Sequence, residues 1–533
     1  MQKISGGLLR SSQPLYDVLA TRQIEHRAAS ALPPHTLMQR AGLAVARLSL
    51  ALRPHAQSIW VACGPGNNGG DGFEAAVHLH GLGKRVTVTW TGPGKNGSPP
   101  DAQASYERAL AAGVPMAEAP PQNFDFCIDA LLGMGLAVGL TRSHPGADLI
   151  AQWLGLMQAS PAARLAIDLP SGLDAETGLS DFVTTKNFKI GVSATKYIAY
   201  NPSKTGRNDL FTLCFLTLKP GLFTANGRDR AGEVWFDDLG VASAADAALP
   251  CAWLLGADRA PSLQRSKALN ASHKGSFGDV AVLGGESTPT NHMAGAALLA
   301  ARAALHAGAG RVFVALLEQP GAEHSSGNMT VDPVQPELMF RSPKVLDFKR
   351  QVIVCGCGGG AAVNTVLTEL LSSAATLVLD ADALNAIALD VHFQAGLRAR
   401  DALGYRTVLT PHPLEAARLL GLKTVDVQAN RLKAASQLAE HFQAVVVLKG
   451  SGTVVAAPGQ LSCINSSGNA LLATAGTGDV LAGMVGAALA SGQNAFDAAC
   501  SAVFAHGRLA DDWALSHPGH ALTASRLASS QSS

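Results

Sequence analysis

The chain has 533 residues, which predicts two domains of roughly 250 residues each rather than one. Hydrophobic residues make up 47% and charged residues 15%, so both domains can bury large cores. The net charge of +1 argues against nucleic acid or an anionic membrane as a partner.

The eight cysteines are scattered, and the close pair Cys355 and Cys357 has no second pair to complete a zinc site. We therefore expect free, buried thiols in a reducing compartment, which predicts a cytoplasmic location. The start, MQKISGGLLRSSQPLYDVLA, lacks an uninterrupted apolar core, so no signal peptide is predicted. No run of about 18 apolar residues occurs, so no membrane span is predicted either.

The first half alternates short apolar runs with helical patterns. Strands are predicted at SIWVAC (58–63) and RVTVTW (85–90), and a helix at FEAAVHLHGLG. FDFCIDALLG (124–133) and RLAIDLPSG (164–172) each predict a strand that ends in aspartate and is followed by a glycine turn. This alternation indicates βαβ units and a parallel sheet, whose ligands bind at the carboxyl ends of the strands. Asp71, Asp129 and Asp168 fall at or just after such ends.

The glycine-rich stretch CGPGNNGGDGF (63–73) follows a strand and opens a helix, so its amides are predicted to face an anionic ligand. It matches neither the dinucleotide fingerprint nor a Walker loop. The oxygen atoms of Asn68, Asp129 and Ser171 can surround a hard monovalent cation. A capped turn without a ligand is the alternative.

Residues 182–208 differ in composition from the rest of the chain, with four Lys, one Arg and no acidic residue. An exposed loop is the simplest interpretation. An insertion, an error in the sequence or a basic loop that binds a partner are the alternatives.

Weak periodicity and prolines place a linker at 241–264, between domains at 1–240 and 265–525, with a disordered tail at 526–533. The second domain is predicted to be α/β as well. Its expected elements are strands within 278–285, 311–317, 351–360, 376–384, 407–413 and 444–453, and a helix at 294–308.

The stretch TAGTGDVLAG (474–483) leads into an Ala- and Gly-rich helix over 480–490. Gly476, Thr477 and Gly478 are predicted to form an anion hole, because unpaired N–H groups and a partial positive charge lie at a helix N-terminus. Asp479 beside it can accept a proton from a hydroxyl that attacks a phosphoryl group. An ordinary acidic residue on a close-packed helix is the alternative.

Three further stretches of the second half carry polar groups at predicted strand ends. Lys449 and the turn amides of 450–453 can hold phosphates, and Asp380, Asp382 and His412 follow other strands. A plain hairpin and a structural histidine are the alternatives.

The second half resembles the ADP-dependent NAD(P)H-hydrate dehydratases, which have a ribokinase-like fold. The resemblance rests on motifs in family order: HKGSFGDVAVLGG, MAGAALLAARAAL, PELM, LVLDADALNA, VLTPHPLEAARLL, VVVLKGSGTVVA and TAGTGDVLAG. It implies that ADP phosphorylates the hydroxyl of a hydrated nicotinamide ring and that phosphate then leaves, giving NAD(P)H, AMP and phosphate. It also implies Mg²⁺ with the phosphates.

Carried over to this chain, the resemblance implies Asp479 as the base. It implies nucleotide contacts at Lys449, Gly450, Ser451, Gly452, Thr453 and Gly478, and hydrate contacts at Ala294, Gly358, His412 and Asp479. The family commonly has GPGLG where this chain has GCGGG (356–360), and the lost proline is expected to loosen that turn and weaken hydrate binding.

The first half resembles the NAD(P)H-hydrate epimerases through GPGNNGGDG, DALLGMGL, DLPSGLDAETG, LKPGLFT and GEVWFDDLG. This implies a Rossmann-like αβα domain that interconverts the R and S hydrates. We expect Asp168 to be the acid–base residue, and the resemblance implies K⁺ held by Asn68, Asp129 and Ser171. The implied hydrate contacts are Asn67, Asn68, Gly69, Gly70, Asp71, Gly133, Met134, Gly135, Leu136, Ala137, Val138, Gly139 and Asp168.

The combined hypothesis is a bifunctional repair enzyme of the YjeF type, in which 182–208 puts the epimerase activity in doubt. A ribokinase-like, ATP-dependent kinase of a small alcohol with a non-catalytic N-terminal binding domain is the alternative. The expected partners are small molecules, with no nucleic acid and no membrane, and the resemblance favours a homo-oligomer.

Overall fold

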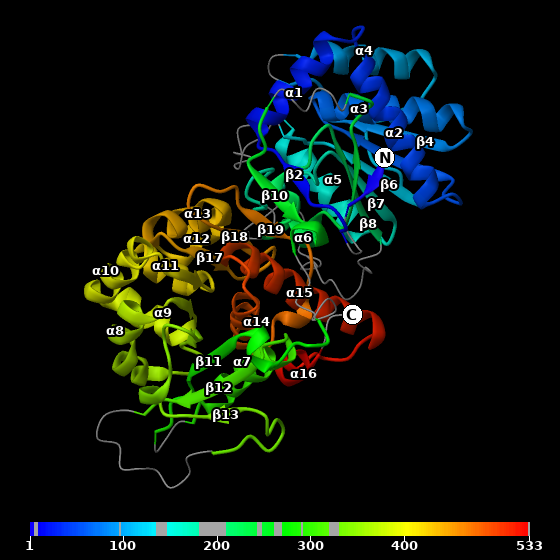
Figure 1. Cartoon of the computed structure of the whole chain (residues 1–533). Coiled ribbons are helices and arrows are strands. Elements are labelled where there is room, and N and C mark those ends of the chain that lie inside the picture. Colours follow the sequence, from blue (N-terminus) through cyan, green and yellow to red (C-terminus); the bar gives the residue numbers. More distant parts are fainter. Residues whose placement is uncertain are drawn as a thin grey trace. The chain divides into compact units, whose positions relative to one another are not determined.

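The computed structural model describes residues 1–4, 9–94, 97–134, 146–180, 209–241, 248–260, 269–288, 292–318 and 330–530. The atypical segment 182–208 lies outside the described residues. The chain divides into two compact units, Met1–Gly7 with Pro14–Cys251 and Leu8–Gln13 with Ala252–Ser533. Each is an α/β unit built on a mainly parallel sheet, as predicted (Figure 1).

The first unit has an eight-stranded sheet in the order β1-β9-β8-β7-β6-β3-β4-β5, parallel except for β1 against β9. Its strands are β1 (Gln2–Lys3), β3 (Ser58–Cys63), β4 (Arg85–Trp90), β5 (Met116–Ala117), β6 (Phe126–Ala130), β7 (Ala163–Ile167), β8 (Leu210–Phe215) and β9 (Glu233–Asp237). Its helices are α1 (Val18–Ser30), α2 (Thr36–Leu52), α3 (Asn67–Gly81), α4 (Pro100–Ala111), α5 (Ala147–Ala159) and α6 (Gly227–Arg230).

The alternation of side chains along β3 explains the three layers of this unit. Ile59, Val61 and Cys63 point to one face, where they pack with residues of α2 and α3. Trp60 and Ala62 point to the other face, where they pack with residues of α5. Apolar residues on both faces are typical of a strand covered by helices on both sides.

The second unit has an eleven-stranded sheet in the order β13-β12-β11-β14-β15-β16-β17-β18-β19-β10-β2. Its strands are β2 (Gln13–Leu15), β10 (Ala252–Leu255), β11 (Asp279–Gly284), β12 (Arg311–Leu316), β13 (Met339–Phe340), β14 (Val352–Cys355), β15 (Thr376–Leu379), β16 (Arg406–Leu409), β17 (Val445–Leu448), β18 (Val454–Ala456) and β19 (Cys463–Asn465). Its helices are α7 (Ala294–His306), α8 (Asn364–Ser373), α9 (Ala381–Leu389), α10 (Val391–Ala399), α11 (Pro413–Leu420), α12 (Thr424–Ala429), α13 (Arg431–Phe442), α14 (Thr477–Ala490), α15 (Ala495–Ser516) and α16 (Ala524–Ser529).

Helices α7, α14, α15 and α16 share one core with one face of this sheet. Small residues let α14 approach its neighbours closely: a Cβ at Gly483 would lie 2.0 Å from the carbonyl oxygen of Ala300 on α7. A Cβ at Gly486 would lie 2.6 Å from Val354 of β14. The glycines inside TAGTGDVLAG and after it therefore also serve packing.

Three predicted boundaries are wrong. Helix α3 begins at Asn67, so most of the glycine-rich stretch is helical. The predicted linker contains the strand β10, which pairs with β19, because its apolar AWLL run is too short to show a period. The predicted tail is helical as far as Ser529, because Thr523 caps α16 and Ala524, Leu527 and Ala528 are buried.

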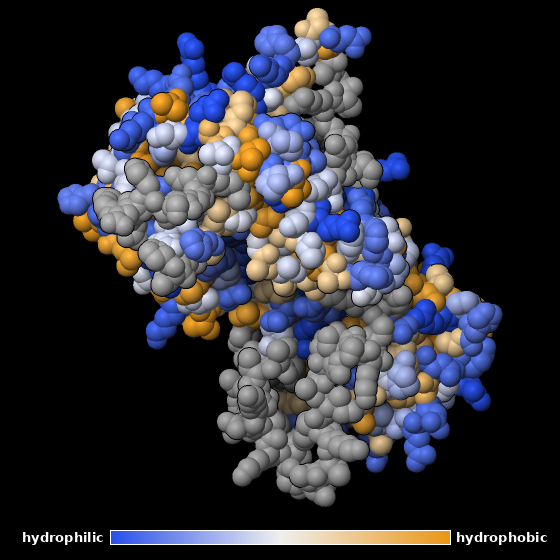
Figure 2. All heavy atoms as spheres, turned by 90° about the horizontal axis from the view of Figure 1, so that it is seen from below, coloured by the Kyte–Doolittle hydropathy of each residue, from blue (hydrophilic) through white to orange (hydrophobic). Residues whose placement is uncertain are grey.

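No helix among the described residues is long and apolar enough to cross a membrane. On the face that Figure 2 shows, apolar side chains are scattered among hydrophilic ones.

We predict that Gly483→Ala lowers the free energy of unfolding by about 1–3 kcal/mol, because the added methyl group pushes α14 away from α7. The measurement is the urea midpoint of the full chain. Gly396→Ala is the matched control inside α10, where the Cβ would lie at an ordinary 3.5 Å from Leu371. It should be neutral or stabilising by up to about 1 kcal/mol; equal effects of the two substitutions would contradict the packing argument.

Candidate active sites

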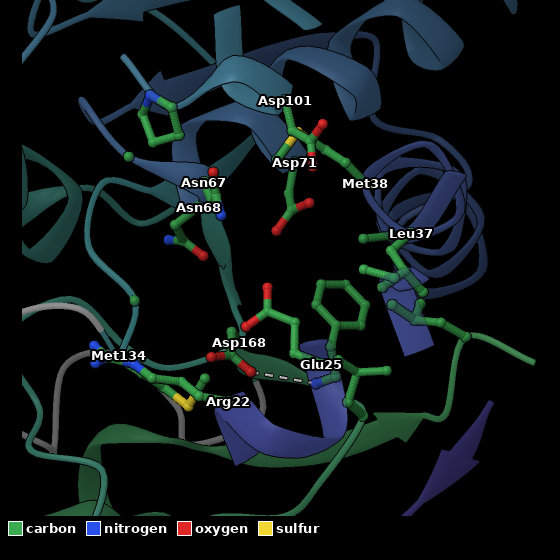
Figure 3. Close-up of a pocket in the computed structure, with 18 of the residues that line it drawn as sticks. Arg22, Glu25, Leu37, Met38, Asn67, Asn68, Asp71, Asp101, Met134 and Asp168 are labelled. Atoms are coloured by element: carbon green, nitrogen blue, oxygen red, sulfur yellow. Dashed lines mark hydrogen bonds between the residues drawn. The ribbon is translucent and has the colours of Figure 1, made fainter. Parts of the chain in front are cut away.

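The first unit contains a cavity of about 910 Å³ at the carboxyl ends of its central strands. Residues of α1, α2, the start of α3, the loop after β6 and the end of β7 line it. Figure 3 shows the carboxyl groups of Asp71 and Asp168 entering this cavity from two sides, with the carboxyl group of Glu25 between them in this view. The structure thus brings together two of the acidic residues that the sequence placed at strand ends.

Asp168 follows β7 directly and holds a left-handed backbone conformation with φ of 62°. Its Oδ1 lies 2.5 Å from the ammonium group of Lys219, whose side chain is only 1% exposed. Lys219 also donates a hydrogen bond to the carbonyl of Phe215 at 2.9 Å. Burial acts to lower the pKa of Lys219, but Asp168 outweighs it and the pKa is raised. The strained backbone and the ion pair together fix this carboxylate.

Two other carboxyl groups of the cavity, Glu25 and Asp71, have no hydrogen bond or ion pair among the described residues. Burial raises the pKa of Glu25, and the charge of Asp168 adds to the effect. Burial raises the pKa of Asp71 well above its usual range, and Asp168 and Glu25 again contribute. These two groups therefore favour the protonated form more than an ordinary surface carboxyl does.

Of the three residues expected to hold a cation, Ser171 and Asp129 are hydrogen-bonded to each other. Ser171 donates from its hydroxyl to Oδ1 of Asp129 at 2.6 Å and from its backbone N–H to Oδ2 at 3.1 Å. Asn68 lines the cavity beside Gly133, and its buried Nδ2 has no hydrogen-bond partner in the described part of the chain. The three side chains offer only oxygen atoms as ligands, which suits a hard cation.

The hydrate positions expected in this unit divide into three groups. Asn67, Asn68, Asp71, Gly133, Met134 and Asp168 line the cavity. Gly69 and Gly70 do not line it: a Cβ on Gly69 would lie 2.1 Å from the Gly64 carbonyl, and one on Gly70 would lie 2.5 Å from Met38 Sδ. Gly135, Leu136, Ala137, Val138 and Gly139 lie outside the described residues.

In the second unit, strand register aligns the ends of three neighbouring strands. Cys355 pairs with Leu379, and Leu379 with Leu409. Asp380, the residue after β15, lies 2.6 Å from Lys449 at the end of β17 and accepts a hydrogen bond from Thr410 at 2.8 Å. A Cβ on Gly478 would lie 3.3 Å from Lys449 Nζ, so the first turn of α14 reaches the same place.

Asp479 lies in that first turn of α14. Burial raises its pKa to about 7, and the charge of Asp380 contributes, while a hydrogen bond with Cys357 and the charge of Lys449 act to lower it. Cys357 Sγ and carboxylate oxygens of Asp380 and Asp479 lie within 4.8 Å of one another. The buried His506 also contacts the carbonyl of Thr477 at 2.9 Å and thereby supports the turn.

The turn 356–360 is closely packed despite its missing proline. Gly356, Gly358 and Gly360 have φ values of 120°, 58° and 52°. A Cβ on Gly358 would lie 2.8 Å from Ala296 and from the Met293 carbonyl, so the turn lies against the start of α7, which begins at Ala294. These contacts bring together two of the residues expected to bind the hydrate. The expected weakening of hydrate binding stays a prediction.

The remaining expected contacts form turns and caps. Residues Lys449 to Thr453 connect the antiparallel strands β17 and β18, with Gly450 and Gly452 at positive φ. His412 caps α11 by accepting hydrogen bonds from the N–H groups of Leu414 and Glu415 through Nδ1. Its Nε2 lies 3.2 Å from Glu415, whose pKa burial raises to about 7. The histidine is thus structural, while its half-exposed ring remains accessible to a ligand.

Comparison with known proteins decides between the families. The NAD(P)H-hydrate dehydratase family matches residues 280–532, and the YjeF-related protein N-terminus matches residues 34–206. The bifunctional NAD(P)H-hydrate repair enzyme Nnr of Escherichia coli (strain K12) is 34% identical and covers 92% of this chain and 88% of its own length. The chain belongs to the family of bifunctional NAD(P)H-hydrate repair enzymes.

Two other relatives match the dehydratase half. The ADP-dependent (S)-NAD(P)H-hydrate dehydratase of Neisseria meningitidis serogroup B (strain ATCC BAA-335 / MC58) is 43% identical over 45% of this chain and 78% of its own. The crystal structure of the ADP/ATP-dependent NAD(P)H-hydrate dehydratase from Bacillus subtilis, co-crystallised with ATP/Mg²⁺, is 29% identical over 49% of this chain and 90% of that chain, with a TM-score of 0.40.

The sequence did not predict that three further residues of this repair enzyme belong to its sites. Lys219 lies in the quoted LKPGLFT motif, but its partner Asp168 is far away in sequence. Glu25 lies on the helix α1, whereas the sequence predicted site residues at the ends of strands. Cys357 was noted because it stands where the family commonly has proline. Its hydrogen bond with Asp479 can be seen only in the folded structure.

We predict that Lys219→Met destabilises the first unit by about 3–5 kcal/mol, because it leaves the carboxylate of Asp168 without its cation. The double variant Lys219→Met/Asp168→Asn should recover most of that loss, since no charge is then left unpaired. Urea unfolding of the single and double variants measures both effects. Additive losses in the double variant would contradict a direct coupling between the two groups.

Proposed function

We propose that this chain repairs hydrated NADH and NADPH in two steps. The first unit interconverts the R and S hydrates, and the second dehydrates the S form at the expense of ADP to NAD(P)H, AMP and phosphate. The observation that carries the proposal is the position of Asp479, a carboxyl with a pKa near 7 in the first turn of a helix that faces the Lys449–Asp380 pair.

The second unit offers the groups that phosphoryl transfer requires. Asp479 accepts the proton of the hydrate hydroxyl as that oxygen attacks the phosphorus of ADP. The N–H groups at the start of α14 and the Lys449 ammonium stabilise the negative charge of the phosphates. The phosphate then leaves with the C–O bond electrons as the ring loses a proton and regains its C=C bond. Mg²⁺ would supply further charge neutralisation and would be held mainly by the phosphates.

The first unit offers a cavity of about 910 Å³, large enough for a nicotinamide ring with its attached sugar and phosphates. Asp168, positioned by Lys219, is the proposed acid–base residue for breaking and remaking the bond at the hydroxyl-bearing carbon. Asn68, Asp129 and Ser171 are proposed to hold K⁺. Bound there, K⁺ would place a positive charge beside the buried carboxyl group of Asp129.

The alternative, an ATP-dependent kinase of a small alcohol, would use the same aspartate and helix start. The identity with bifunctional relatives over 92% of this chain favours the repair function, because it includes both units. The products separate the two: a kinase leaves a stable phosphate ester, whereas the dehydratase releases free phosphate. The family resemblance also leads us to propose that the chain forms a homo-oligomer.

We predict that the full chain converts a mixture of R and S NADPH hydrates completely to NADPH with ADP, Mg²⁺ and K⁺, followed by absorbance of the dihydronicotinamide. Asp479→Asn should slow the dehydration at least about 100-fold, because the base is lost. Asp168→Asn should leave the S form convertible and the R form unconverted.

No conversion by the unaltered chain with ADP or ATP would contradict the repair function. Conversion of S alone would show an inactive first unit, with 182–208 the first segment to examine. Equal loss of both epimers in Asp168→Asn would contradict a separate epimerase site.

We predict that the dehydration rate rises with pH through about 7, because Asp479 accepts a proton only as a carboxylate. Asp380→Asn removes a negative charge that raises the pKa of Asp479, so this limb should move to lower pH. Cys357→Ala removes a hydrogen bond that lowers that pKa, so the limb should move to higher pH. Cys355→Ala, buried in β14, is the matched control and should leave the limb in place.

The measurement is kcat for pure S hydrate between pH 5 and 9. Shifts of the two variants in the same direction would contradict the assignment of Asp479 as the titrating base.

A further inference from the structure

Two aspartates reach the cavity of the first unit from different secondary-structure elements. Asp71 belongs to α3, and Asp168 follows the end of β7. Figure 3 shows their carboxyl groups entering the cavity from two sides, with the carboxyl group of Glu25 between them in this view. A flat ring bound between Asp71 on one side and Asp168 with Glu25 on the other would have a carboxyl group on each face.

The two carboxyl groups differ in their surroundings. Asp168 forms an ion pair with the buried ammonium of Lys219 at 2.5 Å. Asp71 has no such partner in the described residues, and burial together with the charges of Asp168 and Glu25 raises its pKa well above the usual range. A carboxyl paired with a buried cation and a second carboxyl without such a partner can serve in one site as a general base and a general acid.

We propose that Asp71 is a second catalytic acid–base residue of the epimerase, acting on the ring face opposite to Asp168. This inference rests on the proposed epimerase function. It assigns to Asp71 a proton transfer in addition to the hydrate contact that the family resemblance implies. Epimerisation by C–O cleavage can use such a pair, because the hydroxyl leaves from one face and water adds to the other.

The reaction starts from the epimer whose hydroxyl faces Asp71. Asp71 gives its proton to the hydroxyl, and the C–O bond breaks with its electron pair leaving on the oxygen as water. The lone pair of the ring nitrogen stabilises the planar cation that remains. A second water adds to the opposite face and gives a proton to Asp168. One water leaves and one enters, and exchange with solvent returns the proton from Asp168 to Asp71.

In the opposite direction the two residues exchange roles, so each inversion replaces the hydroxyl oxygen by one from solvent. Without Asp71, Asp168 can still protonate a hydroxyl on its own face and guide a water back to that face. Such a variant would exchange oxygen in one epimer without inverting it. A residue that only binds the hydrate would not produce this separation of exchange from inversion.

The test uses the full chain with K⁺ and without ADP, which keeps the dehydratase silent, and pure R or pure S NADPH hydrate in H₂¹⁸O. Chromatography follows inversion and mass spectrometry follows ¹⁸O uptake. The unaltered chain should invert both epimers with one ¹⁸O per inversion. Asp71→Asn should invert at least about 100-fold more slowly and still exchange oxygen in one epimer. Asp168→Asn should show the mirror result in the other epimer.

Asp148→Asn, an exposed aspartate on α5, is the matched control and should behave like the unaltered chain. Folding of each variant is checked by thermal unfolding. If Asp71→Asn fails to fold, Asp71→Glu carries the test, because it keeps the carboxyl and should restore inversion in part.

Inversion by Asp71→Asn at the unaltered rate would overturn the inference, as would a rise in KM with unchanged kcat. Inversion without ¹⁸O uptake by the unaltered chain would overturn it as well. If Glu25→Gln loses inversion while Asp71→Asn still inverts, the proton donor is Glu25, the other carboxyl of the cavity without an ion pair among the described residues. That result would also overturn the inference. Failure of the unaltered chain to interconvert the hydrates would instead contradict the proposed epimerase function itself.

Discussion

Parallel strand pairing is the constraint on which both sites depend. The N–H group of the residue that follows one strand donates to a carbonyl at or near the end of the neighbouring strand: Gly64 to Ala130 at 3.0 Å, Asp168 to Leu213 at 2.8 Å and Asp380 to Cys355 at 3.0 Å. These hydrogen bonds hold the strand ends level, so polar residues just beyond them meet at one edge of the sheet. The glycine turns and helix starts that form the rest of each site are built on this edge.

Both units use the same electrostatic arrangement beyond that edge. A lysine and an aspartate form a close pair, Lys219 with Asp168 and Lys449 with Asp380. Each site also has a second carboxyl, without an ion pair among the described residues, whose pKa burial raises: Asp71 in the first unit and Asp479 in the second. The lysine forms an ion pair with one carboxylate, and the negative charge of that carboxylate helps to raise the pKa of the second carboxyl.

The two proposed activities complement each other chemically. Hydration of a reduced nicotinamide ring creates a new stereocentre and yields both epimers, whereas a site that positions one hydroxyl against Asp479 can accept only one of them. An epimerase on the same chain makes the other epimer available. The similarity to the bifunctional NAD(P)H-hydrate repair enzyme Nnr of Escherichia coli covers 92% of this chain and so extends over both units.

The sequence by itself determined the α/β class, the division into two units, the family and most of the strands, because these follow from short-range periodicity and contiguous motifs. Asp479 and Lys449 were also found from local patterns, a glycine-flanked helix start and a strand followed by a glycine turn. Only the tertiary structure decided that Lys219 pairs with Asp168, that Cys357 contacts Asp479 and that Glu25 and Asp71 enter one cavity. It also revealed β10 and α16, whose short apolar runs become recognisable only when they pack. Such pairings depend on burial and on charges from segments that are far apart in the sequence. The local sequence around each residue does not reveal either of them.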